Sequence, residues 1–153
     1  MAVAVFKQRS IKGEVVFSEA AGSVKVSAVF TELPPGQHGF HIHKAGDLRG
    51  EGCKGACDHF HVGPPQDHGG PPGTTGPRHT GDLGNVSLES GKKMFKKTYT
   101  VEGIKVADLF GRSMIVHADP DDYGKGGQED SLKTGHAGRR IGCAIIGRAE
   151  GCA

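Results

Sequence analysis

The sequence predicts an all-β protein: an eight-stranded antiparallel β-sandwich or barrel with two long functional loops. Short segments rich in β-branched residues recur along the chain, glycine or polar turns separate them, and helix signals are nearly absent. Many short strands with frequent turns favour an antiparallel sandwich or barrel over a fold that alternates strands with helices. The length of 153 residues suits one domain, residues 1–153, around a single core.

Each predicted strand is a short apolar or alternating segment. The first three, VAVFK, GEVVFSE and SVKVSAVF, are rich in valine, and EAAG provides a turn between the second and the third. The eight predicted strands span residues 3–7, 13–19, 23–30, 38–44, 85–90, 94–101, 113–118 and 141–147.

Two long segments lack any strand pattern. Residues 45–84 contain five of the eight prolines, and residues 119–140 are charged and rich in glycine. Loops of this length inside a domain are usually functional or disordered. Six of the nine histidines lie between residues 38 and 68, in the first loop and the strand before it. We therefore expect loops that are ordered by metal.

Composition excludes several classes of function. Nineteen basic against 17 acidic residues give a net charge of +2, too balanced to suggest a nucleic-acid partner. No apolar run approaches 18 residues, so we expect no membrane-spanning helix. The start, MAVAVFKQRS, lacks the long apolar run of a signal peptide, which predicts a cytoplasmic protein. None of the four cysteines forms a C-x-x-C pair, so a zinc-finger or thioredoxin-like motif is not expected.

The segment GFHIH holds the first candidate metal ligands. Residues i and i+2 of a strand point to the same face, so His41 and His43 can reach one ion while Ile42 packs inward. The alternative is a pair of exposed histidines on a strand edge. His117, at the end of the apolar segment MIVHA, could complete an imidazole-rich site, although a single histidine at a strand end is more often structural. Such a site favours copper over zinc by the Irving–Williams order.

The first loop holds a second candidate set. His59, His68, His79 and Asp82 offer three imidazoles and one carboxylate, a closed four-coordinate set that suits zinc. The alternative is an exposed proline-rich loop with incidental histidines.

Five motifs, in order along nearly the whole chain, resemble the copper/zinc superoxide dismutases. They are GFHIH, HGGP (68–71), RHTGDLGNV (78–86), GRSMIVHADPDDYGKGG (111–127) and TGHAGRRIGCAIIG (134–147). The resemblance implies a Greek-key β-sandwich. It also implies one copper and one zinc per chain, and disproportionation of superoxide anion to dioxygen and hydrogen peroxide. The alternative function is a copper- and zinc-binding protein without turnover, such as a metal buffer or a chaperone-like relative.

The resemblance also implies the ligands. Copper is expected on His41, His43, His59 and His117, and zinc on His59, His68, His79 and Asp82. The shared residue, His59, has a catalytic role as well, because its imidazole can release copper and take up a proton for the peroxide product. Asp121 is expected to link a copper histidine to a zinc histidine, with its neighbour Asp122 as the competing candidate.

The resemblance assigns Arg140 as the catalytic residue that attracts the superoxide anion, a task that suits a fixed guanidinium. Lys125, Lys133 and Thr134 fall in the family's electrostatic loop, where clustered charge can raise on-rates.

Cys53 and Cys143 match the disulfide of the family, and Cys57 and Cys152 are expected to be free thiols. The resemblance further implies a homodimer: Phe110 suits its contact surface, whereas the charge of Arg148 does not. It also makes a copper chaperone a candidate partner.

The chain also departs from the family pattern. The zinc loop is longer, with two more residues between His68 and His79 than the family leads us to expect. His61 and His136 stand where the family usually has asparagine. We interpret His61 as a loop residue, with support of a metal ligand as the alternative, and His136 as a surface substitution.

Overall fold

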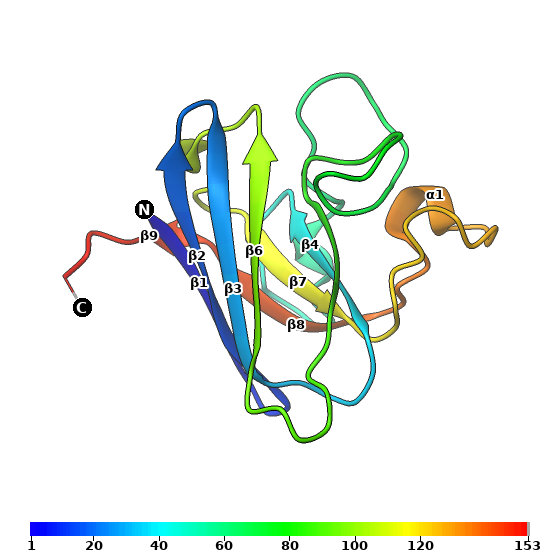
Figure 1. Ribbon diagram of the computed structural model, residues 1–153, viewed down its shortest axis with the longest axis horizontal. Helices are drawn as coiled ribbons and strands as arrows, with labels where there is room; N and C mark the ends of the chain where they lie inside the picture. Colours follow the sequence, from blue (N-terminus) through cyan, green and yellow to red (C-terminus); the bar gives the residue numbers. More distant parts are fainter. Residues whose placement is uncertain (153) are drawn as a thin grey trace.

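Two antiparallel sheets packed face to face make up the computed structural model, which describes residues 1–152 (Figure 1). Ala153, the last residue of the predicted domain, lies outside the described residues. The neighbours in the first sheet are β6-β3-β2-β1-β9, and those in the second are β5-β4-β7-β8. Strand β3 pairs with β6 and β4 with β7, so the chain crosses between the sheets as it does in Greek-key folds. The predicted all-β sandwich is confirmed.

The five-stranded sheet forms because its strands alternate between core and solvent. In β1 the buried side chains of Ala4 and Phe6 alternate with the exposed Val5 and Lys7. The strands of this sheet are β1 (Ala2–Gln8), β2 (Ile11–Ala20), β3 (Ser23–Glu32), β6 (Phe95–Glu102) and β9 (Gly147–Arg148).

The four-stranded sheet is buried on both faces along β4, where all six residues are buried. Phe40 and Ile42 belong to the hydrophobic core, so the alternating His41 and His43 lie on the opposite face. That face is covered by the two long loops rather than by solvent. The strands of this sheet are β4 (His38–His43), β5 (Asp82–Val86), β7 (Ser113–His117) and β8 (Arg140–Ile145).

The core between the sheets is centred on phenylalanine rings. The ring of Phe30 in β3 lies 5.3 Å from that of Phe6 in the same sheet. It also meets Phe40 of the opposite sheet edge-on, with 5.6 Å between ring centres. These contacts fix the spacing of the sheets, and so the position of the face that carries His41 and His43.

Two predicted strands differ in detail from the observed ones. The predicted strand 141–147 is divided into β8 and β9, because the backbone around Ile146 pairs with Gly111 and Arg112 before Gly147 joins β1. The predicted strand 85–90 instead spans Asp82–Val86, since His41 pairs with Asp82 and the chain turns at Glu89. The described residues therefore contain nine strands rather than eight.

The two long loops cover the same side of the second sheet (Figure 1). One contains the short helix η1 (Lys54–Ala56) and the other α1 (Ser131–Thr134), while η2 (Val106–Asp108) precedes β7. The backbone N–H of His68 donates to the carbonyl of Leu132 at 2.8 Å and joins the loops directly. Among residues 1–152, no helix has the length and apolar character needed to cross a bilayer.

Candidate metal centre

Four histidines converge on the outer face of the second sheet, from two strands and one loop. His41 and His43 lie on β4, His117 ends β7, and His59 follows η1. A bridge between the backbones of His43 and His59 holds the loop against the strand. We call His41, His43, His59 and His117 the first cluster. All four are buried, and their ligand nitrogens lie within 4.8 Å of one another.

The hydrogen bonds of the first cluster fix which nitrogen of each ring carries a proton. His43 Nδ1 donates to the carbonyl of Cys57 at 2.8 Å, and His117 Nδ1 donates to that of Gly138 at 3.0 Å. His41 Nε2 contacts Asp121 Oδ2 at 2.5 Å. Each remaining ring nitrogen therefore presents a lone pair.

Those lone pairs have no hydrogen-bond partner among the described residues. His41 Nδ1 and the Nε2 atoms of His43, His59 and His117 are all buried in this way. Buried nitrogens without partners are costly unless something binds them. Burial lowers the pKa of His41 and His43 well below the usual value and that of His117 to about 4, so these rings are neutral at physiological pH. Neutral imidazoles with converging lone pairs suit a metal ion.

A second cluster comprises His59, His68, His79 and Asp82. Asp82 Oδ1 lies 2.9 Å from the Nδ1 atoms of His59 and His68 and 3.4 Å from that of His79. The Nδ1 atoms of His59 and His79 are 3.3 Å apart. Ligands at zinc distances in a tetrahedron are separated by about 3.3 Å, so these four atoms suit a single zinc ion.

His41 also approaches this second cluster. Its ligand atom, with those of His59, His68 and Asp82, forms a set that lies within 4.8 Å. His41 Nε2 already contacts Asp121, however, and its one lone pair, on Nδ1, is needed by the first cluster. His79 Nδ1 has no such competing role, since the other ring nitrogen of His79 donates to the carbonyl of Gln66 at 2.8 Å. The fourth position of the second cluster therefore fits His79 better.

The charges of the second cluster favour a cation. Burial opposes ionisation of Asp82, but hydrogen bonds from His59, His68 and His79 hold the pKa of its carboxyl far below the usual range. Burial alone would lower the pKa of His68, but hydrogen bonds to Asp121 and Asp82 raise it to about 9. His68 thus holds a proton between two carboxylates, and a metal cation can replace that proton.

His59 belongs to both clusters. Its Nε2 faces the first cluster without a partner, and its Nδ1 contacts Asp82 in the second. One imidazole can therefore join two metal ions.

Asp121 connects the clusters a second time. Its Oδ2 contacts His41 Nε2 at 2.5 Å and its Oδ1 contacts His68 Nε2 at 2.8 Å, which orients a ring of each cluster. Asp122, the competing candidate, instead accepts hydrogen bonds from Ser131 Oγ and from the backbone N–H of Gly124 within its own loop. The loop after α1 packs on Asp121 closely enough that a side chain at Gly135, whose φ is +75°, would overlap the carboxylate.

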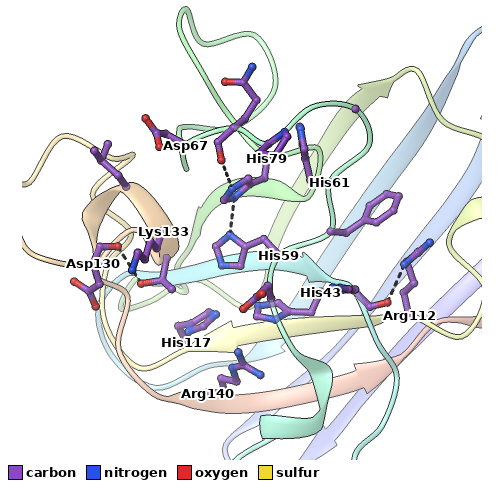
Figure 2. A pocket seen from close by; sticks show the side chains of 18 of the residues that line it. His43, His59, His61, Asp67, His79, Arg112, His117, Asp130, Lys133 and Arg140 are labelled. Atoms are coloured by element: carbon purple, nitrogen blue, oxygen red, sulfur yellow. Dashed lines mark hydrogen bonds between the residues drawn. The ribbon is translucent and has the colours of Figure 1, made fainter.

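The first cluster opens into a cavity of about 910 Å³ (Figure 2). His43, His59, His117 and Arg140 line it near the metal face. The Arg140 guanidinium donates to the carbonyls of Cys53 at 2.8 Å and Cys57 at 2.6 Å, which fixes its position.

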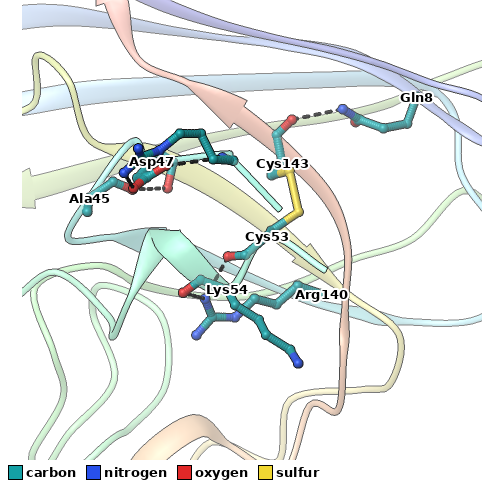
Figure 3. Close-up of a disulfide and its surroundings, with 9 residues drawn as sticks. Gln8, Ala45, Asp47, Cys53, Lys54, Arg140 and Cys143 are labelled. Carbon is teal, nitrogen blue, oxygen red and sulfur yellow. Dashed lines mark hydrogen bonds and ion pairs between the residues drawn. A yellow bond between two sulfur atoms is a disulfide. The ribbon is translucent and has the colours of Figure 1, made fainter. Parts of the chain in front are cut away.

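A disulfide between Cys53 and Cys143 supports that arrangement (Figure 3). It ties the first loop to β8, three residues after Arg140. The pairing expected from the resemblance is confirmed, and Cys57 and Cys152 are free and exposed.

Two of the three residues expected to guide the anion line the cavity. Lys133 and Thr134 line the cavity, whereas Lys125 does not. Sequence reasoning missed Arg112, which also lines the cavity, donates to the carbonyl of Lys44 at 2.9 Å and lies 4.2 Å from the Phe60 ring centre. Arg112 falls within the motif GRSMIVHADPDDYGKGG, but nothing in that motif indicated a position beside the cavity.

An antiparallel sandwich whose outer face carries two abutting clusters of buried histidines, one of them with an aspartate, defines a class of protein that can hold two neighbouring metal ions. The family model of copper/zinc superoxide dismutase (SODC) matches residues 11–146. The chain is 46% identical over 144 residues to a superoxide dismutase [Cu-Zn] of Paramecium bursaria Chlorella virus 1, covering 92% of this chain and 74% of the relative. It is 44% identical to superoxide dismutase [Cu-Zn] A of Xenopus laevis, over 90% of this chain and 89% of the relative.

A solved structure gives the same result at the level of the fold. The crystal structure of the clock protein EA4 superimposes with a TM-score of 0.82 at 39% identity, over 95% of this chain and 92% of that one. The chain belongs to the copper/zinc superoxide dismutase family. Its cofactors are copper and zinc, and its chemistry is that of an oxidoreductase acting on superoxide.

Proposed function

We propose that this chain disproportionates superoxide with its two clusters in different roles. The first cluster would hold copper through His41 Nδ1 and the Nε2 atoms of His43, His59 and His117. The second would hold zinc through Asp82 Oδ1 and the Nδ1 atoms of His59, His68 and His79. The observation that carries this assignment is that buried lone pairs converge while other nitrogens of the same rings are held by hydrogen bonds.

Copper held by His41, His43, His59 and His117 would supply the one-electron redox chemistry that disproportionation of superoxide requires. Arg140 attracts the anion into the cavity, since its guanidinium is fixed by two carbonyls and cannot swing away. His59 lines the same cavity, and its Nε2 is the position from which a proton can reach the reduced oxygen.

Charge around the cavity supports guidance of an anion. The charged residues that line the cavity are Lys44, Arg112, Lys133 and Arg140 against Asp58, Asp67 and Asp130, so basic groups outnumber acidic ones four to three. Thr134 adds a hydroxyl at the rim, and Asp130 contacts His136 Nδ1 at 2.6 Å. Lys125, on the same loop, does not line the cavity but can add to the attraction from farther away, because electrostatic guidance does not require contact.

Metal analysis combined with a superoxide assay tests this function. Purified chain should bind one copper and one zinc, and the copper-loaded form should dismutate superoxide. Zinc without copper, or full metal occupancy without turnover, would instead indicate the metal-binding alternative.

We further propose a homodimer, supported by exposed apolar side chains on neighbouring segments. Phe110 is 39% exposed before β7 and Ile145 is 48% exposed on β8. Arg148 lies beside this pair, with its guanidinium 6.0 Å from the Phe110 ring centre, and is bonded to Glu150. Its charge can thus stay at the rim of a dimer contact. Sedimentation of wild type and Phe110→Glu tests this proposal, because a dimer should dissociate only in the variant.

A cytoplasmic location and a copper chaperone complete the proposal. Two exposed free thiols, Cys57 and Cys152, suit a reducing compartment. The buried ligands of the first cluster favour delivery of copper by a partner over capture from solution. Comparison of copper content after expression with and without a copper chaperone tests the second point.

A further inference from the structure

The loop that carries His68 and His79 has an outgoing segment, which contains His61, and a returning segment, which contains His79 and Thr80 (Figure 2). We call the place where these two segments contact each other the neck of the loop. The backbone N–H of Thr80, on the returning segment, donates to His61 Nδ1 at 3.1 Å. His61 Nε2 donates to the carbonyl of Pro64, on the outgoing segment, at 2.8 Å. One ring therefore joins both sides of the neck.

The hydrogen-bond partners of His61 determine which of its ring nitrogens carries the proton. A backbone N–H can only donate, so Nδ1 accepts; a carbonyl can only accept, so Nε2 carries the proton. Both nitrogens are thereby used within the loop. His61 has no lone pair left for a metal ion, although its ring centre lies only 5.7 Å from that of His79.

The residue held by His61 lies between two proposed zinc ligands. Thr80 directly follows His79 and precedes Asp82 by two positions. The Thr80 hydroxyl oxygen accepts the backbone N–H of Val62 at 3.1 Å, which reinforces the neck beside His61. The next residue, Gly81, donates to the carbonyl of Phe60 at 2.9 Å. The backbone of the returning segment is thus fixed against residues 60–62.

His79 depends on that backbone more than the other ligands do. Its side chain is 15% exposed, whereas those of His59, His68 and Asp82 are at most 2% exposed. Its Nδ1 atom also lies farther from Asp82 Oδ1, at 3.4 Å, than the Nδ1 atoms of His59 and His68, which both lie at 2.9 Å. With less packing around its ring, the position of His79 depends on the loop backbone and on two hydrogen bonds, from its Nε2 to the carbonyl of Gln66 and from its backbone N–H to Asp82 Oδ2.

We propose that His61 is a positioning residue of the zinc site, which holds Thr80 through Nδ1 and Pro64 through Nε2 and so places His79 relative to Asp82. This inference rests on the proposed assignment of His79 and Asp82 as zinc ligands. In this longer loop, the hydrogen bond from the Thr80 N–H to His61 Nδ1 adds to two direct contacts between the segments, from Val62 to Thr80 and from Gly81 to Phe60.

Zinc binding to the metal-free chain tests the proposal without recourse to activity. Affinity is measured by competition with a chromophoric chelator for wild type, His61→Ala, His61→Gln and His79→Ala. His136→Ala serves as the matched control, since His136 is an exposed histidine bonded only within the other loop. His61→Ala should weaken zinc binding by roughly 10–100-fold, as removal of residues that orient ligands typically does.

Two further readouts separate positioning from a general loss of structure. His61→Gln retains an acceptor oxygen for the Thr80 N–H and should recover most of the lost affinity. Cobalt bound at the zinc site should show an altered visible spectrum in His61→Ala and a wild-type spectrum in His136→Ala, because the geometry of the ligands changes only in the first.

The outcomes distinguish this inference from the ligand assignment. If His79→Ala loses zinc while His61→Ala keeps wild-type affinity and cobalt spectrum, the role of His61 is refuted and the ligands stand. If His79→Ala binds zinc as tightly as wild type, the assignment fails and the role of His61 fails with it. Equal weakening in His61→Ala and His61→Gln would refute the hydrogen bond to Thr80 as the cause.

Discussion

The β-sandwich and the two long loops of this chain are held in place by different interactions. The sandwich buries a continuous set of apolar side chains, with Phe30 in contact with rings of both sheets. In the described loop residues 45–81 and 118–139, by contrast, the buried apolar side chains are Ala56, Phe60 and Ala137. These loops depend instead on hydrogen bonds, one disulfide and the residues of the two clusters.

This difference explains why one strand can serve both regions. Strand β4 directs the side chains of Phe40 and Ile42 into the core and those of His41 and His43 to the opposite face, which the loops cover. The sandwich thus provides a rigid row of ligands, and the loops bring the remaining ligands to it. Because a polar, glycine-rich loop buries little apolar surface, we expect metal binding to supply much of its order.

Loss of the shared ligand should give the largest effect. His59→Ala removes a ligand from both clusters, and we expect turnover to fall by more than roughly 100-fold, the upper end for residues that only orient ligands. The sandwich should stay folded, because His59 lies outside its hydrophobic core. Metal content, superoxide turnover and far-ultraviolet circular dichroism measure these effects. Retention of both metals at wild-type levels would contradict the shared role.

Removal of the disulfide should produce the next largest effect, on stability. The bond closes a separation of 90 residues, and the loop-entropy model gives a contribution of about 4–5 kcal/mol to the free energy of unfolding. Urea unfolding of the double variant Cys53→Ser, Cys143→Ser measures this loss. Cys57→Ser is the control and should unfold like wild type, since Cys57 is a free thiol.

Reversal of charge at the cavity should slow turnover without unfolding either region. Arg140→Glu should reduce turnover about tenfold at low salt, and added salt should then raise the rate rather than lower it. Arg139→Glu is the matched control, because Arg139 is exposed and does not line the cavity. Equal effects of the two changes would show that overall charge matters and that the position of Arg140 does not.

The smallest expected effect lies in the sandwich. The Tyr99 hydroxyl is buried without a hydrogen-bond partner among the described residues, and burial raises its pKa well above the usual value. Tyr99→Phe removes this group and should leave stability unchanged or raise it by up to about 1 kcal/mol. A loss of more than about 1 kcal/mol in thermal or urea unfolding would reveal a partner for this hydroxyl.

The sequence was informative where a periodic pattern controls the structure. Alternation in GFHIH places Ile42 in the core and His41 and His43 on the other face, as observed. The division of the last predicted strand between two sheets depends on pairing of Ile146 with distant backbone, which no local pattern records.

In the loops, sequence identified residue types but not their partners. His59 and His61 stand at the same spacing as His41 and His43, yet both ring nitrogens of His61 are engaged in hydrogen bonds with Thr80 and Pro64. The guanidinium of Arg140 is fixed by carbonyls of Cys53 and Cys57, more than 80 residues away. Such contacts arise from the folded backbone, so spacing along the chain could not predict them.

Amide hydrogen exchange of the metal-loaded and metal-free chain tests most directly whether metal orders the loops on a sandwich that is already formed. On removal of metal, amides in residues 45–81 and 118–139 should lose protection, while those of β1, β2 and β3 should retain it. An unchanged exchange pattern, or an equal loss of protection in the sandwich and the loops, would contradict the account.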